Sequence, residues 1–86
     1  MLTKIVRVTQ EIMVTVDETK FDEEFLVEFR ESFYQFHTIE DHLQHLAQLY
    51  ARGLVDNTFD SFIEGYGEAK DFGIEFKQVY GEEEIV

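Results

Sequence analysis

The sequence has 86 residues, which is room for one domain and one core, and its nine Phe, four Tyr and 44% hydrophobic content favour a folded chain over a disordered one. The absence of cysteine excludes disulfides and thiolate zinc sites. Nineteen acidic residues against seven basic ones give a net charge of −12, which repels nucleic acid and anionic membranes and attracts basic proteins.

Two further absences bear on the cellular location. No apolar stretch of the secretory type follows Met1, and no apolar run is long enough to span a membrane. Together with the lack of cysteine, these features lead us to expect a cytoplasmic protein that binds neither nucleic acid nor membrane directly.

The first predicted element is a strand. Apolar residues alternate with polar ones from Val6 to Val16, and many of them are β-branched. A hairpin turning at Gln10-Glu11 is the alternative, but that pair lacks the Gly, Asn or Asp that tight turns require. One long strand, bulged near Gln10, is the favoured interpretation.

Two helices are predicted next. The first begins at Thr19 or Asp22, either of which can cap a helix. Its apolar residues recur at spacings of three and four and so share one face: Phe21, Phe25, Leu26, Phe29, Phe33 and Phe36.

The second predicted helix opens at Thr38, where Asp41 completes a variant of the capping box. It ends at Gly53, which can adopt a left-handed conformation while Leu54 packs back on Leu49 in a Schellman motif. Its buried face is formed by Ile39, Leu43, Leu46, Ala47 and Tyr50.

Residues 54–71 are predicted to be a loop, and alternation over residues 72–80 predicts a strand. A tight turn at Tyr80-Gly81 then gives a C-terminal hairpin in which Phe76 pairs with Ile85. The order β-α-α-loop-β-β predicts a small single α+β domain over residues 1–86, an antiparallel sheet with two helices packed on one face. Its predicted core contains Phe25, Phe29, Leu43 and Leu46.

Three histidines lie close together in the sequence, and His42 and His45 are three positions apart on a predicted helix. That spacing can place two ligands on one metal, but no third ligand follows at a fixed offset. We therefore expect solvent-facing histidines and no metal. Asp56, Thr58 and Asp60 are spaced like the start of a calcium loop, although the later positions that require Gly and Glu are Ser61 and Gly67.

No nucleophile elbow, glycine-rich phosphate loop or cofactor motif is present, so we expect neither an enzyme nor a cofactor. The acidic surface is the remaining candidate site. Glu24, Glu28 and Glu31 form one stripe with neighbours about 5–6 Å apart, close to the spacing of phosphates along a nucleic-acid strand. The predicted partner-binding residues are Asp22, Glu23, Glu24, Glu28, Glu31, Asp56, Asp60, Glu64 and Glu68, with Tyr34 and Tyr66 as partly exposed aromatic residues.

These features lead us to expect a small inhibitor that occupies the basic groove of a nucleic-acid-handling protein. DNA mimics and anti-CRISPR proteins of phages follow this plan, and the analogy is one of size and charge only. The alternative is a structural or regulatory subunit of a homo-oligomer, such as a homodimer, or of a hetero-oligomer. In that case the acidity serves solubility, although −12 exceeds the magnitude of roughly 2–8 that suffices for a small domain.

Overall fold

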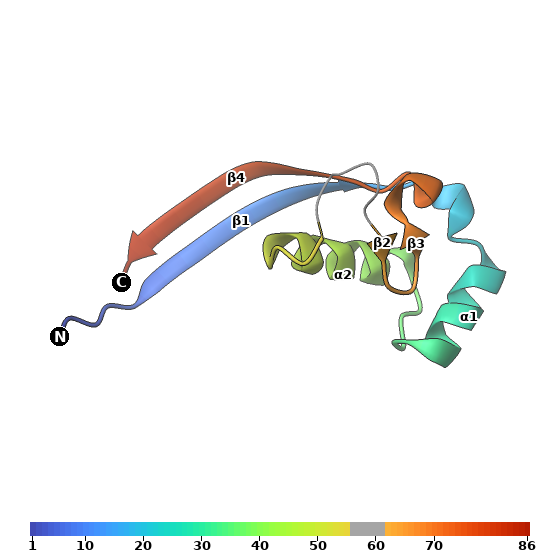
Figure 1. The fold of residues 1–86 in the computed structure, drawn as a ribbon, viewed down its shortest axis with the longest axis horizontal. Helices are drawn as coiled ribbons and strands as arrows, with labels where there is room; N and C mark the ends of the chain where they lie inside the picture. Colours follow the sequence, from blue (N-terminus) through green and yellow to red (C-terminus); the bar gives the residue numbers. More distant parts are fainter. Residues whose placement is uncertain (56–61) are drawn as a thin grey trace.

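A long two-stranded ribbon runs from the helices to the chain termini in the computed structural model, which describes residues 1–55 and 62–86 (Figure 1). Strand β1 (Val6–Thr15) pairs antiparallel with β4 (Glu75–Ile85). The register shifts between Glu11 and Ile12, whose partners are Tyr80 and Gln78, so Val79 of β4 is left as the extra residue of a bulge. The predictions of one long first strand and of a bulge close to Gln10 are confirmed.

The predicted C-terminal hairpin is wrong. Residues around Gly81 continue β4 instead of turning, and Phe76 lies opposite Val14 of β1 rather than opposite Ile85. Pairing along β1 places Phe76 in the buried core. A short hairpin closed at Gly81 would not supply this burial.

Helix α1 (Glu23–Ser32) begins at Asp22, whose side chain accepts a hydrogen bond from the backbone N–H of Phe25 at 2.8 Å. The helix is shorter than its apolar pattern suggests. Phe21 precedes it and is nevertheless buried, and Phe33 follows it with 43% of its surface exposed. A short 3₁₀ helix (Glu18–Lys20) connects α1 to β1.

Helix α2 (Ile39–Ala51) has both predicted ends. Thr38 and Asp41 form the reciprocal capping box. At the other end Gly53 has φ +72°, its N–H bonds to Tyr50, and the N–H of Leu54 bonds to Leu49 at 2.9 Å, which is the Schellman pattern.

The chain between α2 and β4 contains a two-stranded hairpin, β2 (Phe62–Ile63) and β3 (Gly67–Glu68), and a second 3₁₀ helix (Ala69–Phe72). The predicted α+β class and the order of one strand, two helices and then further strands are confirmed. Within the described residues, no helix is long and apolar enough to cross a membrane.

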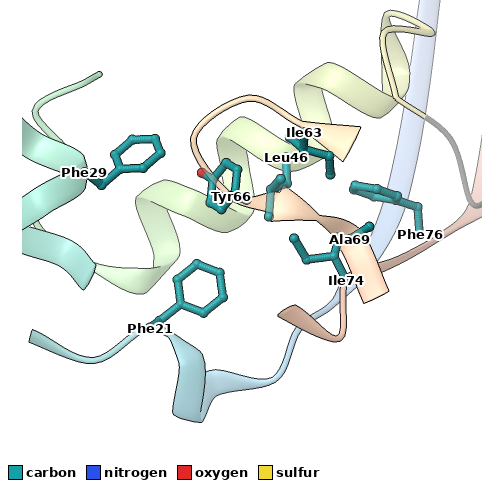
Figure 2. Close-up of a cluster of buried hydrophobic side chains, with 8 residues drawn as sticks. All are labelled: Phe21, Phe29, Leu46, Ile63, Tyr66, Ala69, Ile74 and Phe76. Atoms are coloured by element: carbon teal, nitrogen blue, oxygen red, sulfur yellow. The ribbon is translucent and has the colours of Figure 1, made fainter. Parts of the chain in front are cut away.

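The core lies at one end of the molecule, where α2, the β2–β3 hairpin and the root of the ribbon meet (Figure 2). Of the predicted core residues, Phe29 and Leu46 are buried, and Phe25 and Leu43 are half-buried. The buried hydrophobic cluster comprises Phe21, Phe29, Leu46, Ile63, Tyr66, Ala69, Ile74 and Phe76.

The half of the ribbon that carries the two chain termini projects away from this core (Figure 1). The molecule measures 52 × 27 × 20 Å and its radius of gyration is 15.3 Å, whereas a compact chain of this length has a radius of about 12 Å. Helix α2 packs against β1, and α1 lies beyond the end of the ribbon, far from the chain termini. The two ends of the molecule therefore offer different surfaces.

Candidate functional site

The predicted acidic stripe lies on the solvent side of α1. Glu24, Glu28 and Glu31 are all exposed, as are Asp22 and Glu23 at the start of the helix. Because Phe29 anchors the opposite face in the core, the helix cannot turn these carboxylates inward. The structure thus brings these five acidic residues together on one short helix at the end of the molecule.

No cation of α1 neutralises this face. Arg30 is the only basic residue of the helix, and its Nη1 donates a hydrogen bond to the backbone oxygen of Phe36 at 3.3 Å. Within residues 1–55 and 62–86, none of the α1 carboxylates forms an ion pair, and those that occur are Arg7 with Glu84 and Lys70 with Glu68. The charge of the face is therefore open to a partner.

The remaining acidic candidates do not extend this face uniformly. Glu64 is exposed in the turn of the β2–β3 hairpin. Glu68 is half-buried and pairs with Lys70 at 3.1 Å, which reduces its availability to another basic group. Asp56 and Asp60, together with the calcium-like spacing around them, lie outside the described residues.

The two aromatic candidates have opposite environments. Tyr34 has 55% of its surface exposed and stacks on Phe36, with ring centres 5.4 Å apart. Tyr66 is only 4% exposed, so the expectation of a partly exposed ring is wrong at this position. The β2–β3 turn folds its side chain into the core between α1 and α2 (Figure 2).

The prediction of solvent-facing histidines is also wrong for His42, which is completely buried. Its Nδ1 lies 2.7 Å from the hydroxyl oxygen of Tyr66, and its ring packs edge-on against Phe29 and Phe36. His45 is half-buried and His37 exposed. The sequence holds a signal for this burial, because position 42 lies on the same helical stripe as Ile39 and Leu46.

Burial fixes the protonation state of the pair. Desolvation, followed by the nearby His45, lowers the pKa of His42 to about 4, while Asp41 acts in the opposite direction. Burial likewise raises the pKa of Tyr66 well above its usual range. The two groups thus form a neutral hydrogen bond at pH 7. Both side chains are buried, and their hydrogen bond joins α2 to the β2–β3 turn.

An open groove of about 840 Å³ lies between the end of α1, α2 and β2, with Ser32, Phe33, Tyr34, His45 and Phe62 among its lining residues. Burial and the nearby Arg52 lower the pKa of His45, so this imidazole is neutral at pH 7. In the described part of the chain, no hydrogen bond links Ser32 to His45. The groove therefore combines apolar and aromatic side chains with the polar Ser32, His45 and Glu64, and its described residues form no hydrogen-bonded Ser–His pair.

A second candidate surface, which the sequence analysis did not identify, is the free edge of β1. Among the described strands β1 pairs only with β4, so its outer backbone edge is open. Val6 and Val8 are 50% and 57% exposed, and Met13 is also exposed. An unpaired, β-branched strand edge is a common site of association through backbone pairing.

In the described part of the chain, no group of three or more His, Asp or Glu side chains converges on a possible metal position. The two candidate binding surfaces of the described residues are therefore the charged face of α1 and the open edge of β1. Comparison with known proteins adds no assignment, because no family model, curated protein or solved structure matches the chain.

Proposed function

We propose that this protein acts in the cytoplasm as a binding inhibitor that occupies the basic groove of a nucleic-acid-handling protein. The observation that carries the proposal is the uncompensated acidic face of α1. The helix presents Glu24, Glu28 and Glu31 to solvent while its one cation, Arg30, is bound to the backbone of Phe36.

The geometry of the helix supports this function. Residues three and four positions apart on a helix are about 5–6 Å from one another, and the three carboxylates follow this spacing. A groove that binds nucleic acid offers Lys and Arg at the positions of successive phosphates, and a row of fixed carboxylates can satisfy the same groups. The position of α1 at one end of the molecule lets the face enter such a groove (Figure 1).

The test begins with capture of a partner on the immobilised protein and continues with kinetics on the purified pair. The triple variant Glu24→Lys, Glu28→Lys, Glu31→Lys keeps the buried side of α1 unchanged and should remain folded. Its association rate should fall by about tenfold or more at low salt, because surface charges act mainly on the rate of encounter. Duplex DNA or RNA should compete with the parent protein for the partner.

A matched control changes the net charge equally but leaves α1 intact. Glu75, Glu82 and Glu83 are exposed on β4, and reversing them to Lys moves the net charge from −12 to −6, as the α1 variant does. The control should associate more than threefold faster than the α1 variant. Equal loss in both variants indicates an effect of total charge alone, and simultaneous binding of nucleic acid and protein to the partner excludes the proposal.

The second candidate function is a structural or regulatory subunit of an oligomer, with the acidity serving solubility. The open edge of β1 favours it, since the far half of the ribbon contributes little to the core of its own chain. Salt separates the two candidates. Groove binding through α1 should weaken steeply as salt rises, whereas association through backbone pairing and apolar contacts should change little.

A further inference from the structure

We infer that β1 is a self-pairing edge, which joins two copies of this chain into a dimer with a continuous four-stranded sheet in the order β4-β1-β1-β4. The inference is independent of the proposed inhibitory function. It follows from the direction of the backbone groups of β1, from the charges along this strand and from the exposed apolar residues on both faces of the ribbon.

The backbone direction determines which residues can pair. The N–H of Val86 donates to the oxygen of Ile5, and the N–H of Asp17 donates to the oxygen of Phe72, so odd-numbered residues of β1 direct their backbone toward the β4 side. Backbone direction alternates along a strand, and the N–H and C=O groups of Val6, Val8 and Gln10 therefore point to the free edge. A second antiparallel copy must then place even residues opposite even residues.

A twofold axis can lie at only a few positions under this constraint, and the charges distinguish them. An axis at Arg7 places Arg7 against itself, and an axis at Glu11 places Glu11 against itself, both of which are repulsive. Axes at Val8 or Gln10 place each charge opposite an uncharged residue. Only an axis at Thr9 sets Arg7 opposite Glu11 of the second copy, and it does so twice.

The side-chain geometry of this register is favourable. Arg7 and Glu11 then occupy a non-hydrogen-bonded pair, in which the Cα atoms are about 4.5 Å apart and the side chains are closest. Among the described residues of its own chain, Arg7 forms one long ion pair, 3.9 Å from Glu84, and both side chains are largely exposed. Arg7 is thus able to contact Glu11 of the second copy as well.

The same register also covers exposed apolar surface. Val6 comes opposite Ile12 of the second copy, which is half-buried against its own core, so the two cores are extended toward each other. On the other face of the sheet Ile5, 71% exposed, comes opposite Met13, 55% exposed. These contacts account for the valines on a part of the ribbon that buries almost nothing in the single chain.

The other edge of the ribbon is unsuited to pairing. Glu82, Glu83 and Glu84 are consecutive and exposed on β4, and a row of carboxylates on an edge strand opposes the approach of another strand. The charged residues of β1 are Arg7 and Glu11, one of each sign. The asymmetry directs association to β1 and ends it at two copies, since the outer edges of the four-stranded sheet are both β4.

The experiment is a charge exchange followed by measurement of mass by analytical ultracentrifugation. The parent should sediment at twice the chain mass of 10.2 kDa. Arg7→Glu alone places two carboxylates together, and Glu11→Arg alone places two guanidinium groups together, so each should raise the dimer dissociation constant by about tenfold or more. The double variant should restore the dimer.

A mixture of the two single variants gives the sharpest result. In a mixed pair every Glu faces an Arg, so the two weakened proteins should associate with each other more tightly than with themselves. A loss of stability within one chain cannot produce this rescue, and neither can a change in net charge. The inference is overturned if the parent protein remains monomeric up to millimolar concentration. It is also overturned if neither single substitution changes the dimer dissociation constant.

A cysteine substitution tests the register itself. The chain has no cysteine, and Thr9→Cys places two thiols directly across the twofold axis, with Cα atoms about 4.5 Å apart, within the range that a disulfide bridges. This variant should form a covalent dimer on mild oxidation. Glu82→Cys is the matched control, because Glu82 of β4 lies opposite Thr9. In the dimer, Glu82 is three strand spacings, about 14 Å, from Glu82 of the second copy, which is too far for a disulfide. Equal cross-linking of both variants contradicts the register.

Discussion

The Nδ1 atom of His42 lies 2.7 Å from the hydroxyl oxygen of Tyr66, and this hydrogen bond joins α2 to the turn of the β2–β3 hairpin inside a shell of aromatic rings. The Nε2 atom of the same ring has no hydrogen-bond partner in the described structure. An unpaired buried polar atom costs roughly 1–3 kcal/mol, so the core contains a polar group that reduces its stability and makes it sensitive to pH.

Acid should weaken the fold through His42. The pKa of His42 is about 4 in the folded chain, against an ordinary value of 6.5 for histidine, so the unfolded chain binds the proton first as pH falls. The contribution of neutral His42 to the free energy of unfolding is therefore fully present above pH 6.5. It is lost as the pH falls from 6.5 to 4, by up to about 1.4 kcal/mol per pH unit. Denaturant unfolding at pH 7.5, 6 and 5 measures this dependence.

The control for this prediction is the double variant His42→Leu, Tyr66→Phe, which removes the titrating ring and its partner together and leaves no orphaned group. Its stability should depend less on pH over the same interval. Asp17 and Asp41, whose carboxylates accept hydrogen bonds that lower their pKa, lose their contribution at more acidic pH and are unchanged in the variant. Identical pH profiles for parent and variant contradict the role of His42.

Replacing Phe29 by Ala should lower the free energy of unfolding by roughly 3–5 kcal/mol, because the ring is 2% exposed and packs on His42 and Tyr66. Phe33→Ala is the matched control, since this ring is 43% exposed just beyond the same helix. The control should cost about 1 kcal/mol or less. Equal losses in chemical denaturation show that Phe29 is not the anchor of α1.

Two glycines in the β2–β3 hairpin should differ in their tolerance of Ala. Gly65 and Gly67 have φ of +92° and +90°, so both substitutions carry the cost of a left-handed residue, about 1–2 kcal/mol. A Cβ on Gly65 meets Phe29 Cε2 at 2.6 Å, whereas a Cβ on Gly67 meets nothing within 4 Å. Gly65→Ala should therefore have the lower melting temperature, and the reverse order contradicts the packing of Phe29 on the turn.

Zinc should leave the melting temperature unchanged. His42 and His45 have the spacing of a ligand pair, but His42 is buried with its Nδ1 on Tyr66, and no described cluster supplies a third ligand. Thermal unfolding with zinc and with a chelator tests this prediction. A rise with zinc that disappears in His45→Ala points to a metal site that includes this ring.

Local chemistry in the sequence determined β1 and both ends of α2, but not the length of α1 or the β2–β3 hairpin. The alternation from Val6 identified β1, and the Thr38–Asp41 box and Gly53 set the limits of α2, because capping and turn preferences depend on neighbours within a few residues. The acidic stripe of α1 could be predicted for the same reason, since helical periodicity places Glu24, Glu28 and Glu31 on the face opposite Phe29.

Only the tertiary structure decided how these elements meet. A strand over residues 75–85 can turn on itself at Gly81 or pair along its length with β1, and both have reasonable local chemistry. The strand pairs with β1 because this arrangement brings Phe76 and Val14 together at the core. Distant contacts likewise buried His42 and Tyr66 and left the edge of β1 open, since burial and pairing depend on residues far apart in the chain.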